Sequence, residues 1–292
     1  MFFVFALISM ASYALHNVLM APYYRRNDQL AVVTLRGLGM SLAMVPGLLV
    51  VGSAGWAAVG PQLPWLLGAS AAALLGNWAA ANAVRHLPIG IATALNMSLS
   101  TVVASGLGLW LLDETLTWAQ LGWMGLIFLG VFGLGAVRRP PITTITVSLS
   151  RGLMFSLVFG LALGVGFTLI SRVSRSLEPL MAGWCWESLI TLMGAGVLLL
   201  RRGAYGHIGS VPPRRELGRI FVFCLPGAVG TSCYALAVAS GPVAIVAAIL
   251  GTMMVAASIL AWLFHGERLS GGQWLFVAVV CLAVMGLRSA AG

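Results

Sequence analysis

The sequence predicts an all-α integral membrane protein with ten transmembrane helices, arranged as two inverted five-helix repeats. The composition, the number of long apolar stretches and an internal repeat predict this fold class. Of the 292 residues, 60% are hydrophobic and 8% are charged, and the mean hydropathy is +1.00. A soluble core of this length could not bury so much apolar surface. We therefore expect the lipid bilayer to surround the chain.

The apolar stretches set the number of helices. A membrane-spanning helix needs about 20 apolar residues. Stretches of about that length lie at 2–21, 29–51, 65–84, 88–111, 118–137, 152–173, 180–200, 217–239, 242–264 and 271–288. The first has no basic leader and no cleavage site, so we interpret it as a spanning helix and not as a signal peptide.

The ten stretches divide into two sets of five. We expect a first five-helix repeat at 1–137, a polar, proline-containing linker at 138–150 and a second five-helix repeat at 151–292. Because five is an odd number, the second repeat enters the membrane from the opposite side to the first. Such inverted repeats place a binding site between the two halves near the bilayer midplane.

The internal repeat joins residues 77–135 to residues 231–287. At an offset of 154, Pro88 falls on Pro242. Each copy contains an apolar helix, a break at the proline, a second apolar helix, a polar turn and a third apolar helix. A pattern that occurs twice in this order indicates duplication.

The polar turn of each copy contains a glutamate, Glu114 or Glu267. It is followed by a hydroxyl residue and, three positions later, a glutamine, at 117–120 and 270–273. This spacing is a capping box and predicts that a new helix begins there. We expect both glutamates to serve the structure of their turns.

The charge pattern excludes some classes of protein. The 16 basic residues give a net charge of +9, but they are all arginines and nearly all lie between apolar stretches, which argues against nucleic-acid binding. Most follow the odd-numbered spans, whereas Arg172, Arg175 and Arg288 lie on the opposite side. The positive-inside rule then places both termini outside the cytoplasm. The four cysteines lack metal-ligand spacing and no nucleotide-binding loop is present, so we expect no metal and no cofactor.

The ten helices in two halves, Arg36 in the second span, and a Glu-x-Leu-[Ser/Thr] turn after the fourth and ninth spans resemble the drug/metabolite transporter superfamily. Within it, the chain resembles the EamA branch and its exporters of aromatic amino acids, over nearly the whole length. The second repeat has Cys185 or Trp186 where the first has Arg36. The resemblance implies a multi-pass transporter of the cell membrane (the inner membrane of a bacterium), with both termini in the cytoplasm, against the charge pattern.

Polar groups within spans are costly in hydrocarbon, so each is a candidate for a functional site. Glu187 is the only carboxylate well inside a span and stands beside Trp184 and Trp186. It suits a proton-coupling group or a counter-charge to a substrate ammonium. The alternative is a glutamate that holds helices together. Arg36 needs a partner or a route to the interface, and its alternative is a structural bond to a carbonyl.

Further candidates gather on the repeated hairpins and on the first span. Trp78 and Asn82 are four residues apart, so one helix face offers an aromatic wall and an amide to an amphiphilic solute. The predicted substrate-binding residues are His16, Asn17, Asn77, Trp78, Asn82, Asn96, Ser100, Trp184, Glu187, Tyr234 and Thr252. The alternative for each of them is an interhelical hydrogen bond.

The resulting hypothesis is a secondary-active exporter of small amphiphilic metabolites, namely amino acids including aromatic and apolar ones. It would work by alternating access around a central cavity between the repeats, and one chain would suffice as a monomer. The alternative is a proton-coupled exporter of hydrophobic cationic drugs. An intramembrane aspartyl protease is disfavoured because the only aspartates, Asp28 and Asp113, lie at span ends. A channel would need a ring of like residues, which one chain with inverted halves does not offer.

Overall fold

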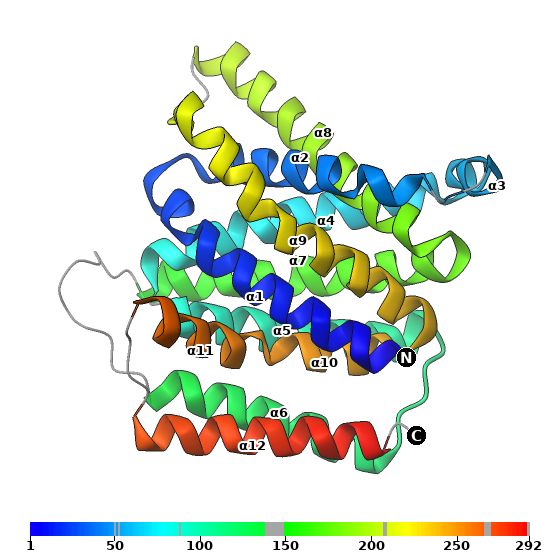
Figure 1. Ribbon diagram of the computed structural model, residues 1–292, viewed down its shortest axis with the longest axis vertical. Helices are drawn as coiled ribbons and strands as arrows, with labels where there is room; N and C mark the ends of the chain where they lie inside the picture. The colour runs from blue at the N-terminus through cyan, green and yellow to red at the C-terminus, as the bar shows by residue number, and fades with distance from the viewer. Residues whose placement is uncertain are drawn as a thin grey trace.

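The computed structural model describes residues 1–49, 51, 53–87, 89–137, 149–206, 209–265 and 270–290. Within these ranges the chain forms twelve α-helices and no strand (Figure 1). The helices are α1 Phe2–Arg26, α2 Gln29–Leu48, α3 Ser53–Ala57, α4 Val59–His86, α5 Ile89–Leu111, α6 Trp118–Val137, α7 Leu149–Ser176, α8 Pro179–Tyr205, α9 Arg214–Ser240, α10 Val243–Gly251, α11 Met253–His265 and α12 Gly271–Ala290.

Among the described residues, most of each apolar stretch predicted to span the membrane lies on a helix, although α4, which carries the stretch at 65–84, is not among the helices apolar enough to span. The stretch at 242–264 differs, because it is divided at Thr252 into α10 and α11. In the described part of the chain, α1, α2, α7, α8, α9 and α12 are long and apolar enough to cross a membrane, and α5, α6 and α10–α11 hold shorter apolar segments. Pro88, Glu267 and residues 138–148 of the predicted linker lie outside the described residues.

Local capping explains where several helices begin. The Asp28 carboxylate accepts from the backbone N–H of Ala31 at 3.1 Å, and so caps α2. Glu178 caps α8 in the same way, by accepting from Met181 N–H at 2.8 Å. The predicted capping boxes at the starts of α6 and α12 are confirmed, because in each the glutamine side chain and the hydroxyl bond to each other's backbone N–H.

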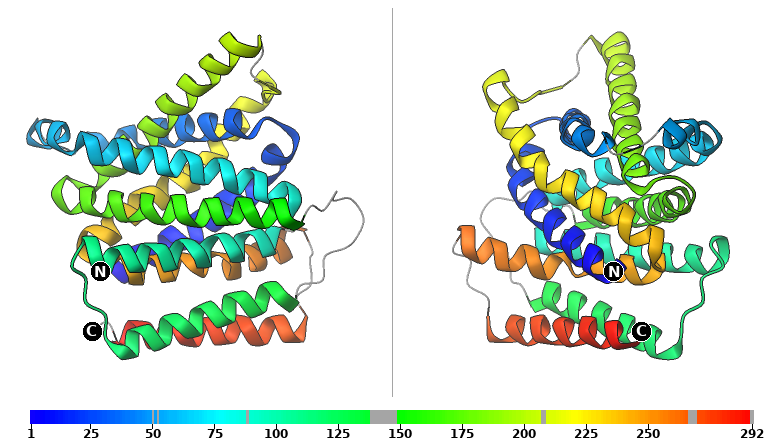
Figure 2. Two further views of the ribbon diagram at one scale, coloured as in Figure 1. Left: turned by 180° about the vertical axis from the view of Figure 1, so that it is seen from behind. Right: turned by 45° about the vertical axis from the view of Figure 1, so that its right-hand side comes forward.

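The largest contacts between helices join the two halves of the chain. Each of four helices of the first half packs on a helix of the second half: α4 on α7, α1 on α9, α2 on α8 and α6 on α12. Figures 1 and 2 show α6 and α12 side by side at one edge of the molecule. The pairing is reciprocal: the third long helix of one half packs on the first of the other, and the reverse also holds. The faces that would otherwise be exposed are therefore buried between the halves.

The helix ends define two sides of the molecule. We call the side where α1 begins and α12 ends the terminal side (Figure 1). The other is the arginine side, where α1 ends with Arg25 and Arg26 and α8 ends near Arg202. The loop between α5 and α6 lies on the terminal side.

Candidate functional site

A cavity of about 130 Å³ lies between the two halves. Its lining residues are Tyr13, Asn17, Ala21, Tyr24, Arg36, Asn77, Ala80, Ala81, Val84, Asn96 and Met97 from the first half, and Phe159, Leu163, Phe167, Trp186, Glu187, Ile190, Leu250 and Met253 from the second. Those on α1 and α4 lie toward the C-terminal ends of these helices. The cavity therefore extends from the middle of the molecule toward the arginine side.

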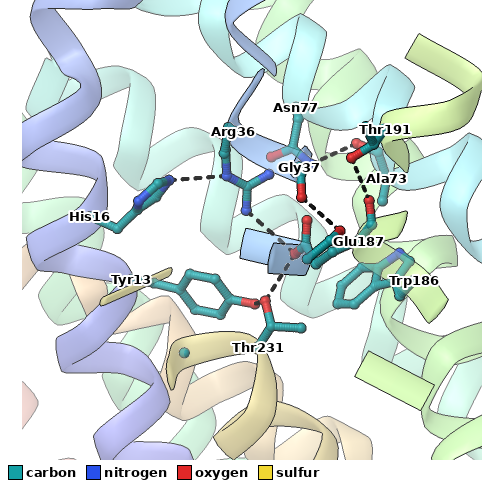
Figure 3. Close-up of polar contacts among 12 residues, drawn as sticks. Tyr13, His16, Arg36, Gly37, Ala73, Asn77, Trp186, Glu187, Thr191 and Thr231 are labelled. Carbon is teal, nitrogen blue, oxygen red and sulfur yellow. Dashed lines mark hydrogen bonds and ion pairs between the residues drawn. The ribbon is translucent and has the colours of Figure 1, made fainter. Parts of the chain in front are cut away.

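A buried ion pair forms one wall of this cavity. Arg36 Nη2 of α2 lies 3.8 Å from Glu187 Oε1 of α8, and the two side chains are 7% and 2% exposed (Figure 3). Gly37 permits this approach, because a Cβ there would lie 2.6 Å from Thr191 Oγ1 and 3.3 Å from the Glu187 carbonyl oxygen. Burial of two charges requires further hydrogen bonds to both of them.

His16 supplies such a bond to Arg36. Arg36 Nε donates to His16 Nε2 at 3.0 Å, and His16 Nδ1 lies 2.8 Å from the Phe223 carbonyl oxygen (Figure 3). Because a guanidinium only donates and a carbonyl only accepts, Nε2 is the acceptor and Nδ1 carries the hydrogen. His16 is therefore a neutral imidazole in a fixed tautomer. His16 does not line the cavity, but its hydrogen bond holds Arg36, which does.

Two hydroxyl groups supply the bonds to Glu187. Thr231 Oγ1 of α9 donates to Glu187 Oε1 at 2.9 Å, and the Tyr13 hydroxyl lies 2.7 Å from Thr231 Oγ1. Since Thr231 gives its hydrogen to Glu187, Tyr13 must donate to Thr231. A directed chain of hydrogen bonds thus ties α1 and α9 to the carboxylate. Among the described residues, Arg36 Nη1 and Glu187 Oε2 are buried without a hydrogen-bond partner.

Three of the predicted amides line the same cavity. Asn17 donates to Met253 Sδ at 3.2 Å, and Asn77 donates to the Ala73 carbonyl oxygen at 2.8 Å. Asn96 Oδ1 is buried without a partner in the described part of the chain. The structure therefore brings Asn17, Asn77, Asn96 and Glu187 together around one space.

Three other predicted residues lie away from the cavity lining. The Trp78 ring packs edge-on against Phe155 at 5.6 Å, and Asn82 donates to the Trp78 carbonyl oxygen at 2.8 Å. Trp184 packs edge-on against Trp56 at 5.7 Å. The expected wall of Trp78 and Asn82 is therefore not part of the cavity lining: Trp78 packs on α7, and Asn82 bonds to the backbone of its own helix.

Ser100, Thr252 and Tyr234 also do not line the cavity. Ser100 and Thr252 bond to backbone carbonyls three residues earlier, at 3.0 and 2.6 Å. Tyr234 lies directly behind the wall, with its ring centroid 4.9 Å from that of Phe167 and 6.1 Å from that of Trp186. It supports two aromatic side chains that do line the cavity.

Several lining residues were not among the predicted binding residues. Tyr13 and Tyr24 follow the spacing of one face of α1, which also carries the predicted Asn17. That spacing could have identified them. The sequence singled out Arg36 as a charge within a span and placed Trp186 beside Glu187, but only the fold shows that all three line one cavity.

The comparisons with known proteins agree with this fold. Residues 150–289 match the EamA-like transporter family. No curated protein matches the sequence. A crystal structure matches over 99% of this chain and 96% of that one, with a TM-score of 0.72 and 16% identity, which shows a shared fold alone.

The family match covers the second half of the chain, where Glu187, Thr231 and Trp186 lie. In the described part of the chain, six helices are also long and apolar enough to cross a membrane, which supports a multi-pass membrane protein.

Proposed function

We propose that the chain is a secondary-active transporter that exports small amphiphilic metabolites, namely amino acids including aromatic and apolar ones. It would work by alternating access around the cavity between two inverted repeats. The Arg36–Glu187 pair in the wall of that cavity carries the proposal. The direction of transport rests on the sequence resemblance described above.

The pair offers complementary charges to a zwitterion. Arg36 Nη1 is a free donor and Glu187 Oε2 a free acceptor among the described residues. A substrate carboxylate would bind the first and a substrate ammonium the second, and each would satisfy a buried group that is otherwise costly. Phe167 and Trp186 supply an aromatic surface for the side chain.

The size of the cavity favours a small solute. Its volume is about 130 Å³. Pockets that bury drug-sized ligands measure roughly 300–1,000 Å³. In this conformation the space is therefore closer to a single metabolite than to a hydrophobic drug.

The inverted repeat is supported by the helix caps and by the reciprocal contacts. Asp28 and Glu178 cap α2 and α8 by the same backbone bond, which aligns the two helices at an offset of 150. At that offset Arg36 corresponds to Trp186 and not to Cys185. At these two equivalent positions the first half contributes a guanidinium to the cavity and the second half an aromatic ring.

The alternative is a proton-coupled exporter of hydrophobic cations, in which Glu187 exchanges a proton for the drug. The mostly apolar and aromatic wall of the cavity favours it. The Arg36 guanidinium at 3.8 Å opposes it, because a cation bound at Glu187 would lie beside a fixed positive charge.

The test is transport by the purified protein in proteoliposomes, with labelled tryptophan, phenylalanine, methionine, leucine and lysine beside a quaternary ammonium dye. We expect saturable exchange of apolar amino acids, with a KM raised about tenfold or more by Glu187→Gln, since hydrogen bonds to charged groups contribute about 1.5–3 kcal/mol. Glu216→Gln, a matched change on α9 outside the cavity lining, should leave KM unchanged. Dye flux driven by a pH gradient, without amino-acid flux, would establish the alternative instead.

A further inference from the structure

A second cluster of charges closes the terminal side of the molecule. Glu114, in the loop after α5, forms an ion pair with Arg175 near the end of α7. The same carboxylate accepts from the backbone N–H groups of Val243 at 2.7 Å and Ala244 at 3.3 Å. A glutamate of the first half therefore caps α10 of the second half, where the helix dipole favours a negative charge. The sequence predicts that Glu114 serves only the structure of its own turn, whereas here it also binds a helix of the other half.

Arg175 holds the preceding helix at the same point. Its Nε donates to the Val238 carbonyl oxygen and its Nη2 to the Gly241 carbonyl oxygen, both at 3.1 Å. These carbonyls lie at the C-terminal end of α9, where a cation is favoured. Glu114 and Arg175, which we call the terminal-side latch, thus fasten the α5–α6 loop to α7, α9 and α10.

One face of α7 leads from the cavity to this latch. Phe167 lines the cavity, Ser171 follows one turn later and is fully buried, and Arg175 follows one turn after that. Tyr234 packs on Phe167 from the other side. The cavity extends toward the arginine side, so buried side chains and then the latch separate it from the terminal side.

We propose that the terminal-side latch is a gate of the transport cycle. Glu114 and Arg175 hold the terminal side closed in this conformation and separate when that side opens. The inference rests on the proposed alternating access, in which the halves part on one side at a time. The latch joins a loop of the first half to three helices of the second, so it must break in that movement.

The surroundings of the latch suit a contact that breaks repeatedly. The Arg175 side chain is 29% exposed, although the Glu114 side chain is only 6% exposed. Water can therefore replace the hydrogen bonds of Arg175 as the halves separate. The Arg36–Glu187 pair, at 7% and 2% exposure, has no such access and would need a substrate to replace its contacts.

Thiol labelling tests the gate without knowledge of the substrate. The four native cysteines, Cys185, Cys224, Cys233 and Cys281, are replaced by alanine, and Ser171→Cys places one thiol on the path between cavity and latch. A membrane-impermeant maleimide is applied from the terminal side of oriented vesicles. Glu114→Gln keeps an acceptor for α10 but removes the charge. Arg175→Gln removes the cation.

We expect either change to raise the labelling rate from the terminal side about tenfold, because losing contacts made only in the closed state shifts the population toward the open one. Asp113→Asn is the matched control, since it neutralises the adjacent acid and asparagine tolerates the positive φ of 50° found there. Thermal unfolding of each variant confirms that it is folded.

Labelling rates equal to the parent in both folded variants would overturn the gate and leave a static brace. Faster labelling without any solute flux would support the gate but contradict the proposed substrates. Amino-acid flux together with unchanged labelling rates would support the proposed substrates but contradict the gate.

Discussion

Arg36 and Glu187 stabilise each other in a place where neither charge could remain alone. We predict that Arg36→Gln or Glu187→Gln destabilises the protein by about 3–5 kcal/mol, because each leaves one buried charge without its partner. The double variant should recover much of that loss of stability, whereas its substrate binding should stay weakened. Thermal unfolding in detergent, with and without phenylalanine, measures both effects. Single variants as stable as the parent would show that water reaches the pair.

His16 acts on the site through Arg36. We predict that His16→Phe weakens substrate binding and costs about 1–3 kcal/mol of stability, because Arg36 Nε is left buried without an acceptor. His16→Gln, whose side-chain oxygen can accept the same hydrogen bond, should restore part of the substrate binding and part of the stability. Substrate-induced thermal shifts compare the variants. Equal shifts in the parent and the phenylalanine variant would contradict a positioning role.

Part of the site could be predicted from single residues. The rest depends on how each helix is rotated about its axis, which decides the side chains that face the cavity. Polar groups within spans could be identified as candidates because burying them in hydrocarbon is costly. Two of these candidates, Glu187 and Asn17, do line the cavity. Trp184 and Trp186 are two residues apart and point to different neighbours, but nothing in the sequence shows which of them faces the cavity. Long-range partners such as Thr231 are likewise invisible before the helices pack.

At the level of the helix, α2 and α8 pack closely because Gly37 has no side chain. We predict that Gly37→Ala destabilises the protein by about 1–3 kcal/mol through overpacking against Thr191 and the α8 backbone. The matched control is Gly203→Ala on α8, where no atom of the described residues lies within 4 Å of the added carbon; this change should be neutral or stabilising. Unfolding midpoints compare the two. Equal midpoints would show that α8 moves aside at no cost.

Hydropathy predicted where most of the helices lie, because a spanning helix is apolar over most of its length. The same property hid the division at Thr252, since the stretch around it stays apolar while the helix is interrupted. The Glu114 side chain shows a similar limit. Its turn was recognisable from the capping box, but its bonds to α10 depend on contacts between the halves.

For the whole molecule, most of the packing surface lies between the halves. We predict that fragments 1–137 and 149–292, expressed separately, are unstable, because α1, α2, α4 and α6 each lose the helix of the other half on which they pack. Co-expressed, they should associate and purify together through a tag on one of them. A fragment that is stable and monodisperse alone would contradict this account.

If the chain is the proposed inverted repeat, its two halves are not chemically equal. In the second half the helix is interrupted at Thr252, whereas α5 of the first is continuous, and Arg36 corresponds to Trp186. For a carrier that works by the proposed alternating access, this asymmetry predicts that the two open states differ in free energy. One orientation would then be more populated at rest, and half-saturating concentrations would differ on the two membrane faces. The equilibrium distribution of substrate between the two sides of the membrane is unaffected. Tighter substrate binding on one face is offset by slower reorientation of the loaded carrier away from that face.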